Sequence, residues 1–330
     1  MKRIKKTMLL MGLVLICSLV LGVSAYAADK KSTGVINLKY AGGAEGAGTY
    51  RSALAIASLV NKYSKRIKIF VQITPGTTVT PKMIQAGQVD LAAGSQSGET
   101  QATQGLAKYK GKPVTNMSRL FVWGESTYVI FSPVEKNIFS INDLIGKKVG
   151  IGAKTQPTGK TCETILKTLG LADKLKYSFN TSAVELGERI KDGLYDAGFY
   201  GVSHPWAVLM DLATTRKMRI IGIGGENLDK VVKVLAPRYG ALTMPANIYP
   251  GQDKGFPTVG AMQTTCVRTD LDEDVAYEII KIVETHLDEF AMAYPPAKFY
   301  FPNMNSQKRA IAPLHPATKR WLKEKGIKVE

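Results

Sequence analysis

One order of elements occurs twice in the chain, and it constrains the fold more than any other feature. In each copy a strand-like run leads into a loop rich in glycine or hydroxyl groups, then a helix, a strand, a second helix, a Gly-x-x-Asp turn and a third strand. The first copy has its loop at residues 42–50, and the second at residues 152–160. Strands that alternate with helices in this way form parallel sheets with crossover helices. The sequence therefore predicts two α/β lobes of similar plan.

One further strand-like run follows each copy, at residues 120–132 after the first and at residues 257–267 after the second. Two strands that cross between the lobes would form a hinge. A long helix is predicted over residues 270–290, and the proline-rich tail at residues 295–316 should pack back on the first lobe. We expect one lobe to consist of residues 28–125 plus 258–330, and the other of residues 126–257.

The loop at residues 42–50 reads Gly-Gly-Ala-Glu-Gly-Ala-Gly-Thr-Tyr. Backbone N–H groups that are free at a helix start, together with the helix dipole, bind anions. The glycine order is G-x-x-G-x-G, which differs from the G-x-G-x-x-G fingerprint of dinucleotide sites. A tight connector without a ligand would explain the same residues, so both interpretations remain open here.

In open α/β sheets, ligands bind beyond the carboxyl ends of the strands. Four loops are predicted at that edge, at residues 41–50, 94–100, 152–160 and 199–206. Two lobes that face each other with these loops between them would enclose a single cleft.

The first 27 residues have the organisation of an export signal. Four basic residues precede an apolar run, and Ala25-Tyr26-Ala27 fits the small-x-small cleavage pattern. We expect cleavage after Ala27; a retained membrane anchor is the alternative. Ile16 before Cys17 argues against a lipoprotein site, and no later stretch reaches the roughly 18 apolar residues that span a bilayer.

Charge and cysteine content limit the possible partners. The formal net charge is +17, of which four positive charges lie in the predicted signal. Such a field attracts anionic solutes or an acidic partner, and we expect no nucleic-acid partner for an exported chain. Cys162 and Cys266 fall in different predicted lobes, so we expect free thiols and no disulfide framework.

Several motifs occur in a characteristic order along nearly the whole chain after the predicted signal. They are Gly42-Gly43-Ala44-Glu45-Gly46, Gly87-Gln88-Val89-Asp90-Leu91-Ala92, Gly146-Lys147-Lys148-Val149-Gly150-Ile151-Gly152-Ala153, Lys191-Asp192-Gly193-Leu194-Tyr195-Asp196-Ala197, Tyr249-Pro250-Gly251-Gln252-Asp253, Pro257-Thr258-Val259 and Leu314-His315-Pro316. In this order and spacing the chain resembles the TAXI solute-binding proteins, the periplasmic receptors of one branch of the TRAP (tripartite ATP-independent periplasmic) transporters.

The resemblance implies a two-lobed type II periplasmic-binding-protein fold of class α/β, in which each lobe is a mostly parallel sheet flanked by helices and two strands form the hinge. It also implies a small organic anion or amino acid as ligand, glutamate-like or dicarboxylate, and the sodium-coupled integral membrane subunits of a TRAP transporter as partners. We accordingly expect a periplasmic, monomeric binding protein that is not an enzyme and needs no cofactor or metal.

The chain departs from the family pattern at three places. Gly48 and Thr49 replace two aromatic residues, residues 155–158 read Thr-Gln-Pro-Thr in place of Gly-Ser-Gly-Thr, and Trp123 replaces a tyrosine. Glu125 matches the family. Trp123 and Trp206 near the cleft suggest a ligand with a flat or apolar part.

We expect the ligand to be held by backbone N–H groups, hydroxyls, amides and aromatic rings of the four loops and the linking strand. The predicted ligand-binding residues are Gly43, Ala44, Glu45, Gly46, Ala47, Thr49, Ser95, Gln96, Ser97, Trp123, Glu125, Thr155, Gln156, Pro157, Thr158, Tyr200, His204 and Trp206. Glu45 is ambiguous, because it could point to solvent or bind an ammonium group of a zwitterionic ligand.

Two other functions remain as alternatives. A binding protein for a flat heterocyclic solute, of the thiamine-precursor kind, would use the same fold. A nucleotide-binding enzyme could use Lys154–Thr161, a P-loop-like stretch whose first glycine is replaced by Lys154, although Pro157 and the export signal argue against it. His286 and His315 are expected to be structural, and no nucleophile elbow is present.

Overall fold

The computed structural model describes residues 34–43, 45, 47–77, 79–309 and 311–329. The predicted signal and Cys17 lie outside these residues, so the signal remains a prediction. In the described part of the chain, no helix combines the length and apolar composition that a bilayer crossing requires.

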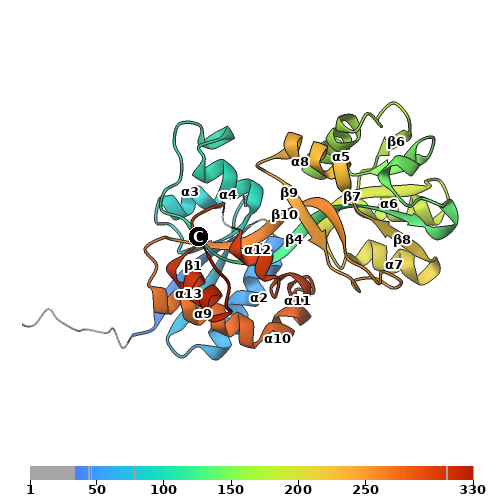
Figure 1. The fold of residues 1–330 in the computed structure, drawn as a ribbon. Coiled ribbons are helices and arrows are strands. Elements are labelled where there is room, and N and C mark those ends of the chain that lie inside the picture. The colour runs from blue at the N-terminus through green and yellow to red at the C-terminus, as the bar shows by residue number, and fades with distance from the viewer. Residues whose placement is uncertain (1–33, 44, 46, 78, 310, 330) are drawn as a thin grey trace, which may run out of the picture. The chain divides into compact units, whose positions relative to one another are not determined.

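The described residues form a ten-stranded mixed sheet within one unit, residues 37–330 (Figure 1). Its main path runs in the order β2-β1-β3-β10-β4-β7-β5-β6, while β8 pairs with β4 and β9 pairs with β10. The strands are β1 (Ile36–Gly43), β2 (Ile67–Ile73), β3 (Leu91–Ser95), β4 (Ser118–Pro133), β5 (Lys148–Ile151), β6 (Lys176–Phe179), β7 (Ala197–Ser203), β8 (Met218–Ile221), β9 (Gly240–Met244) and β10 (Phe256–Val267).

Helices flank this sheet, as the alternating sequence pattern predicts. They are α2 (Gly48–Tyr63), α3 (Thr80–Gln85), α4 (Gln96–Thr103), α5 (Pro157–Thr168), α6 (Ala183–Lys191), α7 (Ala207–Thr215), α8 (Gly225–Leu235), α9 (Glu273–Thr285), α10 (Leu287–Ala293), α11 (Ala297–Tyr300), α12 (Met304–Lys308) and α13 (Pro316–Glu324). We call β1–β3 with α2–α4 and α9–α13 the first half, and β5–β8 with α5–α8 the second half.

The two copies of the sequence pattern become parallel strands. In the first half β1 pairs in parallel with β3, and in the second half β5 pairs in parallel with both β6 and β7. The long strands β4 and β10 pair with each other in antiparallel register along much of their length and connect the halves. This arrangement confirms the predicted α/β class with a two-strand connection; the predicted lobe boundaries in residue number remain a prediction.

The Gly-x-x-Asp turns close both copies in the same way. Asp90 accepts a hydrogen bond from the backbone N–H of Lys39 at 2.8 Å, and Asp196 accepts one from the N–H of Lys148 at 2.9 Å. Each aspartate also donates its own N–H to the carbonyl of the same lysine residue. The turn residue therefore ties the start of the third strand to the first strand of its own copy.

The long helix that the sequence predicts over residues 270–290 is two helices, so that prediction is wrong in detail. Asp272 caps α9 by accepting the Val275 N–H at 2.9 Å, and α9 ends at Thr285. His286 leaves helical geometry, with ψ at 34°, and its ring stacks on Tyr63 at 3.5 Å. This contact with α2 interrupts the helix before α10 begins.

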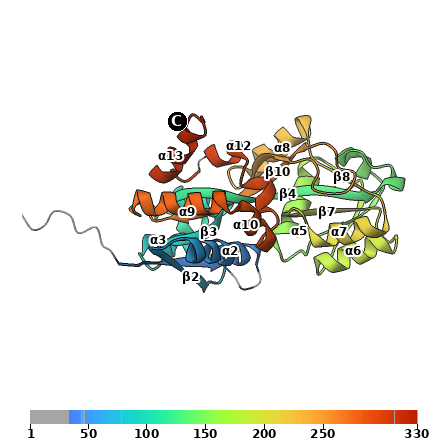
Figure 2. The same ribbon diagram turned by 90° about the horizontal axis from the view of Figure 1, so that it is seen from below.

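The C-terminal tail packs on the first half. Leu314 bridges to Arg119 on β4, and the Nε2–H of His315 donates to the Leu271 carbonyl at 3.0 Å. Figure 2 shows α13 alongside α9, and the two helices are in contact. Cys162 and Cys266 are free and buried, which confirms the expectation for both.

Candidate functional site

A cleft of about 640 Å³ lies between parts of the two halves. The first half contributes the start of α2 and the segment that follows α10, including Tyr294. The connecting strands contribute Ser126 and Gln263, and the second half contributes the end of β7 and the start of α7. The cleft is therefore built at the strand ends, where the sequence predicts a ligand.

The start of α2 is suited to an anion. Ala47 is its N-cap residue with extended backbone geometry, no side chain caps it, and no acidic residue lies in its first turn. The N–H of Arg51 bonds to the Ala47 carbonyl at 3.0 Å, so the N–H groups of the preceding turn stand at the open end of the helix. The exposed side chain of Arg51 lines the same wall and adds a full positive charge.

Tyr294 contributes a polar group to the first-half wall of the cleft. Its hydroxyl donates to Oε1 of Gln263 at 2.9 Å, and its ring packs edge-on against Trp123 at 5.2 Å. A Cβ atom at Gly48 would lie 3.7 Å from the Tyr294 ring, an ordinary van der Waals contact, so Gly48 lies directly beside Tyr294 in this wall. Burial raises the pKa of Tyr294 to about 12 against the opposing influence of Ser203 and Arg51, which keeps the hydroxyl neutral.

An aromatic pair forms the opposite wall. Trp206 lines the cleft and stacks on Tyr200, with ring centroids 5.0 Å apart and planes 12° apart. Phe131 packs edge-on against Trp206 at 5.6 Å. These contacts hold the indole in one orientation, where it offers an apolar surface to a ligand.

Of the predicted site residues, Ala47, Thr49 and Trp206 line this cleft. Gly43 ends β1 with φ of +98°, and a Cβ there would lie 2.6 Å from the Thr49 hydroxyl oxygen, so glycine allows the loop to close on α2. Glu45 is exposed and is not among the lining residues. Ala44 and Gly46 lie outside the described residues.

Four predicted residues are buried behind the cleft lining or beside it. Trp123 and Glu125 on β4 are 0% exposed, as is His204 after β7. Tyr200 is half-buried beneath Trp206. These side chains shape and support the lining.

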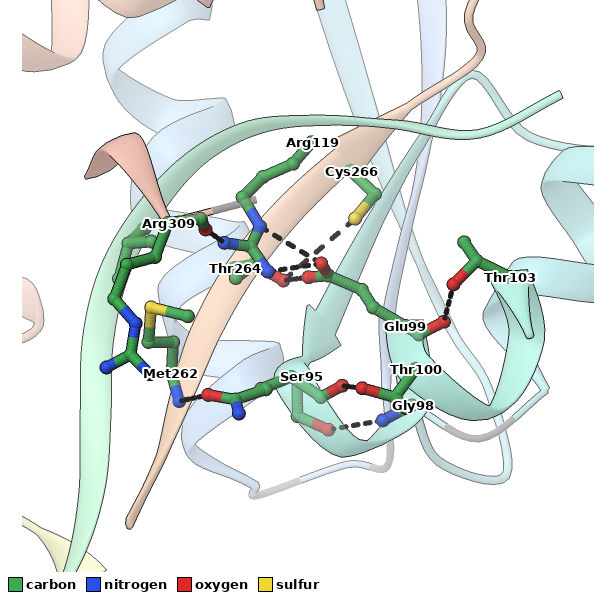
Figure 3. Close-up of polar contacts among 12 residues, drawn as sticks. Ser95, Gly98, Glu99, Thr100, Thr103, Arg119, Met262, Thr264, Cys266 and Arg309 are labelled. Atoms are coloured by element: carbon green, nitrogen blue, oxygen red, sulfur yellow. Dashed lines mark hydrogen bonds and ion pairs between the residues drawn. The ribbon is translucent and has the colours of Figure 1, made fainter. Parts of the chain in front are cut away.

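The polar groups of Ser95, Gln96 and Ser97 bond to other residues of the chain, and Figure 3 shows the bond between Ser95 and Gly98. Ser95 caps α4 by accepting the Gly98 N–H at 3.3 Å, and Ser97 accepts from Gln101 at 3.2 Å. Gln96 is 3% exposed and bonds weakly to the Pro237 carbonyl at 3.4 Å. None of the three is among the residues that line the cleft.

A buried ion pair anchors this segment. Figure 3 shows the Arg119 guanidinium directed at the Glu99 carboxylate, with Nε 3.0 Å from Oε2. Thr264 also donates to Glu99, and Arg119 donates to the Arg309 carbonyl. Both charged side chains are at most 1% exposed, so the network fixes α4 to β4, β10 and the tail.

The second glycine-type loop packs on its own half. Thr155 and Gln156 are exposed, and Thr158 donates to the Gly201 carbonyl at 3.4 Å. The side chain of Pro157, at the start of α5, lies outside what the structure describes. None of these four residues is among the cleft lining, although their neighbour Gly201 is.

Sequence reasoning missed five polar lining residues: Arg51, Ser126, Ser203, Gln263 and Tyr294. Arg51 could have been predicted from the sequence, because it is a cation in the first helical turn after the glycine loop. Ser203 lies within the predicted loop at residues 199–206, whereas Ser126, Gln263 and Tyr294 depend on how β4, β10 and the 293–296 segment meet in space. Among the described residues, no group of His, Cys, Asp or Glu side chains is arranged to hold a metal ion.

The fold is that of periplasmic solute-binding proteins. The model of the NMT1-like family matches residues 41–326, so the chain belongs to that family. A TctC solute binding protein from Polaromonas superposes with a TM-score of 0.52 at 13% identity, covering 81% of this chain and 89% of that one. MatC from Rhodopseudomonas palustris, solved with bound malate, gives a TM-score of 0.47 at 12% identity over 89% of this chain and 96% of that one.

Proposed function

We propose that the chain is an exported, periplasmic, monomeric solute receptor of the TAXI type, which captures a small organic anion or amino acid in the cleft and delivers it to TRAP-type membrane subunits. The observation that carries the proposal is the pairing of Arg51 and the uncapped start of α2 on one wall with Trp206 on the other. A carboxylate at the first wall and an apolar body against the second would satisfy both.

The polar residues between these walls would orient the ligand. Tyr294 donates its hydroxyl hydrogen to Gln263 and keeps an oxygen that can accept, and Ser126 and Ser203 can donate or accept. Binding would stabilise a closed arrangement, because only closure brings the first-half anion site and the second-half indole onto one molecule. The membrane subunits would recognise that closed form.

The stacked Tyr200–Trp206 pair also favours the second candidate, a flat heterocyclic acid or base of the thiamine-precursor kind. The nucleotide-binding alternative has less support. A Cβ at Gly159 would lie 2.4 Å from the Gly152 carbonyl oxygen and 2.2 Å from that of Ala153. Carbonyl oxygens therefore crowd the start of α5, where a phosphate would need N–H donors.

A thermal-shift panel on the chain from residue 28 tests the proposal. The panel contains dicarboxylates, glutamate and other amino acids, and flat heterocyclic acids, with uncharged amides of the same acids as matched controls. We expect at least one acid to raise the melting temperature and its amide to have no effect. Hydrolysis of ATP or of a model ester by the same preparation would contradict the receptor assignment.

A further inference from the structure

Five buried polar side chains gather beside the cleft in a cluster that we call the polar ring: Glu125, Thr127, His204, Tyr249 and Tyr300. Tyr249 is 4% exposed and the other four are 0% exposed. Tyr300 interacts electrostatically with both Glu125 and Tyr249, and the Tyr249 hydroxyl lies 2.6 Å from Nδ1 of His204. His204 lies near the backbone of Thr127, which is on the same face of β4 as Glu125.

The ring contains an unusual number of unsatisfied atoms. Among the described residues, no hydrogen-bond partner is found for Glu125 Oε2, Thr127 Oγ1, His204 Nε2 or the Tyr300 hydroxyl. Buried polar atoms are normally satisfied, and each orphaned one costs about 1–3 kcal/mol. Four of them on adjacent side chains indicate a polar interior whose hydrogen bonds depend on where its protons are.

Two hydrogen bonds position the Tyr249 hydroxyl between His204 and Trp206. The Tyr249 hydroxyl oxygen lies 2.7 Å from the backbone N–H of Trp206, which can only donate. Tyr249 therefore accepts from Trp206, and its hydroxyl also contacts Nδ1 of His204 at 2.6 Å, so these two bonds hold it between the Trp206 backbone and the imidazole. Burial lowers the pKa of His204 to about 3, in keeping with a neutral ring.

The same Tyr249 hydroxyl connects the ring to the cleft. It is the hydrogen-bond partner of the Trp206 backbone, and Ser203, Pro205 and Trp206 all line the cleft. A change in the ring that moves Tyr249 or His204 would thus move the aromatic wall of the cleft.

Glu125 is the ring member that titrates near neutral pH. Burial raises its pKa to about 7, while the hydrogen bond from Ser306 and the charge of Arg309 act in the opposite direction. The other titratable groups around it are Tyr300 from α11 and, through Tyr300, Tyr249 and Tyr294, and burial raises the pKa of each of these tyrosines. Protonated Glu125 can donate from Oε2 to an oxygen of the ring, whereas ionised Glu125 is a buried anion with one donor, Ser306.

We propose that the polar ring is a proton-controlled switch on the cleft: protonated Glu125 completes the ring and fixes Ser203–Trp206, and release of that proton to solvent loosens this segment. The inference concerns the regulation of the same site and rests on the proposed function only in taking the cleft as the place where the solute binds. The switch itself is measurable without any solute.

The experiment follows indole N–H resonances of the ¹⁵N-labelled chain from residue 28 between pH 5 and pH 8.5. The resonance of Trp206, assigned with Trp206→Phe, should shift with a midpoint near pH 7. Trp321 is the internal reference, because its Nε1 donates at 3.0 Å to Glu284, whose pKa is held below its usual value by Lys281, Lys325 and Trp321 against the effect of burial. In Glu125→Gln the Trp206 transition should disappear, and in His286→Gln, which alters a histidine stacked on Tyr63, it should persist.

A second variant separates the switch from simple misfolding. In Tyr249→Phe the Glu125 carboxyl carbon should still titrate, but Trp206 should no longer follow it. A Trp206 resonance that is constant with pH in the unsubstituted chain, or that still shifts in Glu125→Gln or Tyr249→Phe, would overturn the proposal. Because no solute is present, such a failure is distinct from a failure of the thermal-shift panel.

Discussion

The two copies of the α/β pattern share a scaffold and differ in their loops. Asp90 and Asp196 tie equivalent strands together with nearly equal distances, and Arg51 and Lys160 each occupy the fourth position of the helix that follows the loop. Yet the first loop lines the cleft, whereas the second packs on β7. The difference shows that a repeated scaffold positions a loop without determining whether that loop meets a ligand.

The largest expected effect is on the free energy of unfolding, and it compares a buried ion pair of the first half with a partly exposed pair of the second. Glu99→Gln leaves the Arg119 guanidinium buried without its counter-ion, and breaking such a pair costs about 3–5 kcal/mol of unfolding free energy. Glu163→Gln, which removes a partly exposed pair with Lys167 in the second half, should cost less than about 1 kcal/mol. Urea denaturation of both variants measures the contrast, and equal losses would contradict it.

The next prediction contrasts two carboxyl groups with opposite pKa shifts. The raised pKa of Glu125, about 7, means that its contribution to stability is present at acidic pH and is lost as pH rises from about 4.5 to 7. The loss amounts to about 3 kcal/mol from the size of the shift, and Glu125→Gln should abolish it. Burial opposes ionisation of Asp196, but Lys136 and the Lys148 N–H hold its pKa below the usual value, so its contribution is lost as pH falls.

Urea denaturation at pH 5 and pH 8 measures the Glu125 slope, because the Asp196 contribution is lost only below its usual pKa of 3.8. Glu125→Gln should gain stability relative to the unsubstituted chain at pH 8 and little at pH 5. If the difference in unfolding free energy between Glu125→Gln and the unsubstituted chain is the same at both pH values, the buried carboxyl does not titrate in this range.

Arg51 and Lys160, which occupy the fourth position of α2 and α5, test the comparison of the two loops directly. Once the panel identifies an acid that binds, Arg51→Gln should weaken its binding about 10- to 100-fold, as expected for loss of a charged hydrogen-bond partner. Lys160→Gln, at the matching position of α5, should leave the affinity unchanged. Calorimetric titration measures both, and an equal loss in Lys160→Gln would place the second loop in the site.

The smallest effect should be shared by the two halves. Asp90→Ala and Asp196→Ala each remove a carboxylate that accepts a backbone N–H, at a cost of about 1–2 kcal/mol. Similar losses in urea denaturation would support equivalent scaffolds. A loss confined to one variant would mean that the turns differ in function despite their geometry.

Much of the fold was predictable because its signals are local. Glycine turns, capping residues and alternating strands give the element order, and a repeated order gives the two α/β halves. The break at His286 was not predictable, since it depends on a ring contact with Tyr63 more than 200 residues away in sequence.

The candidate site divides in the same way. Ala47, Thr49 and Trp206 follow from the rule that ligands lie at strand ends, and the structure brings them to one cleft. Gln263 and Tyr294 meet only because β10 and the segment after α10 converge, which no local pattern records. Ser95 and Gln96 do lie at the strand ends, where the rule expects a ligand, but their hydrogen-bonding groups bond to other residues of the chain.

The antiparallel pairing of β4 and β10 is irregular between Gln263 and Thr264, where Trp123 is the extra residue on β4. An inserted residue bends a strand and increases its local twist. The backbone thus has its natural bending point within the connection, next to Trp123, Gln263 and Tyr294. Any motion that narrows the cleft by turning about this bend would therefore shift Gln263 and Tyr294, the two neighbours of the bend that line the cleft.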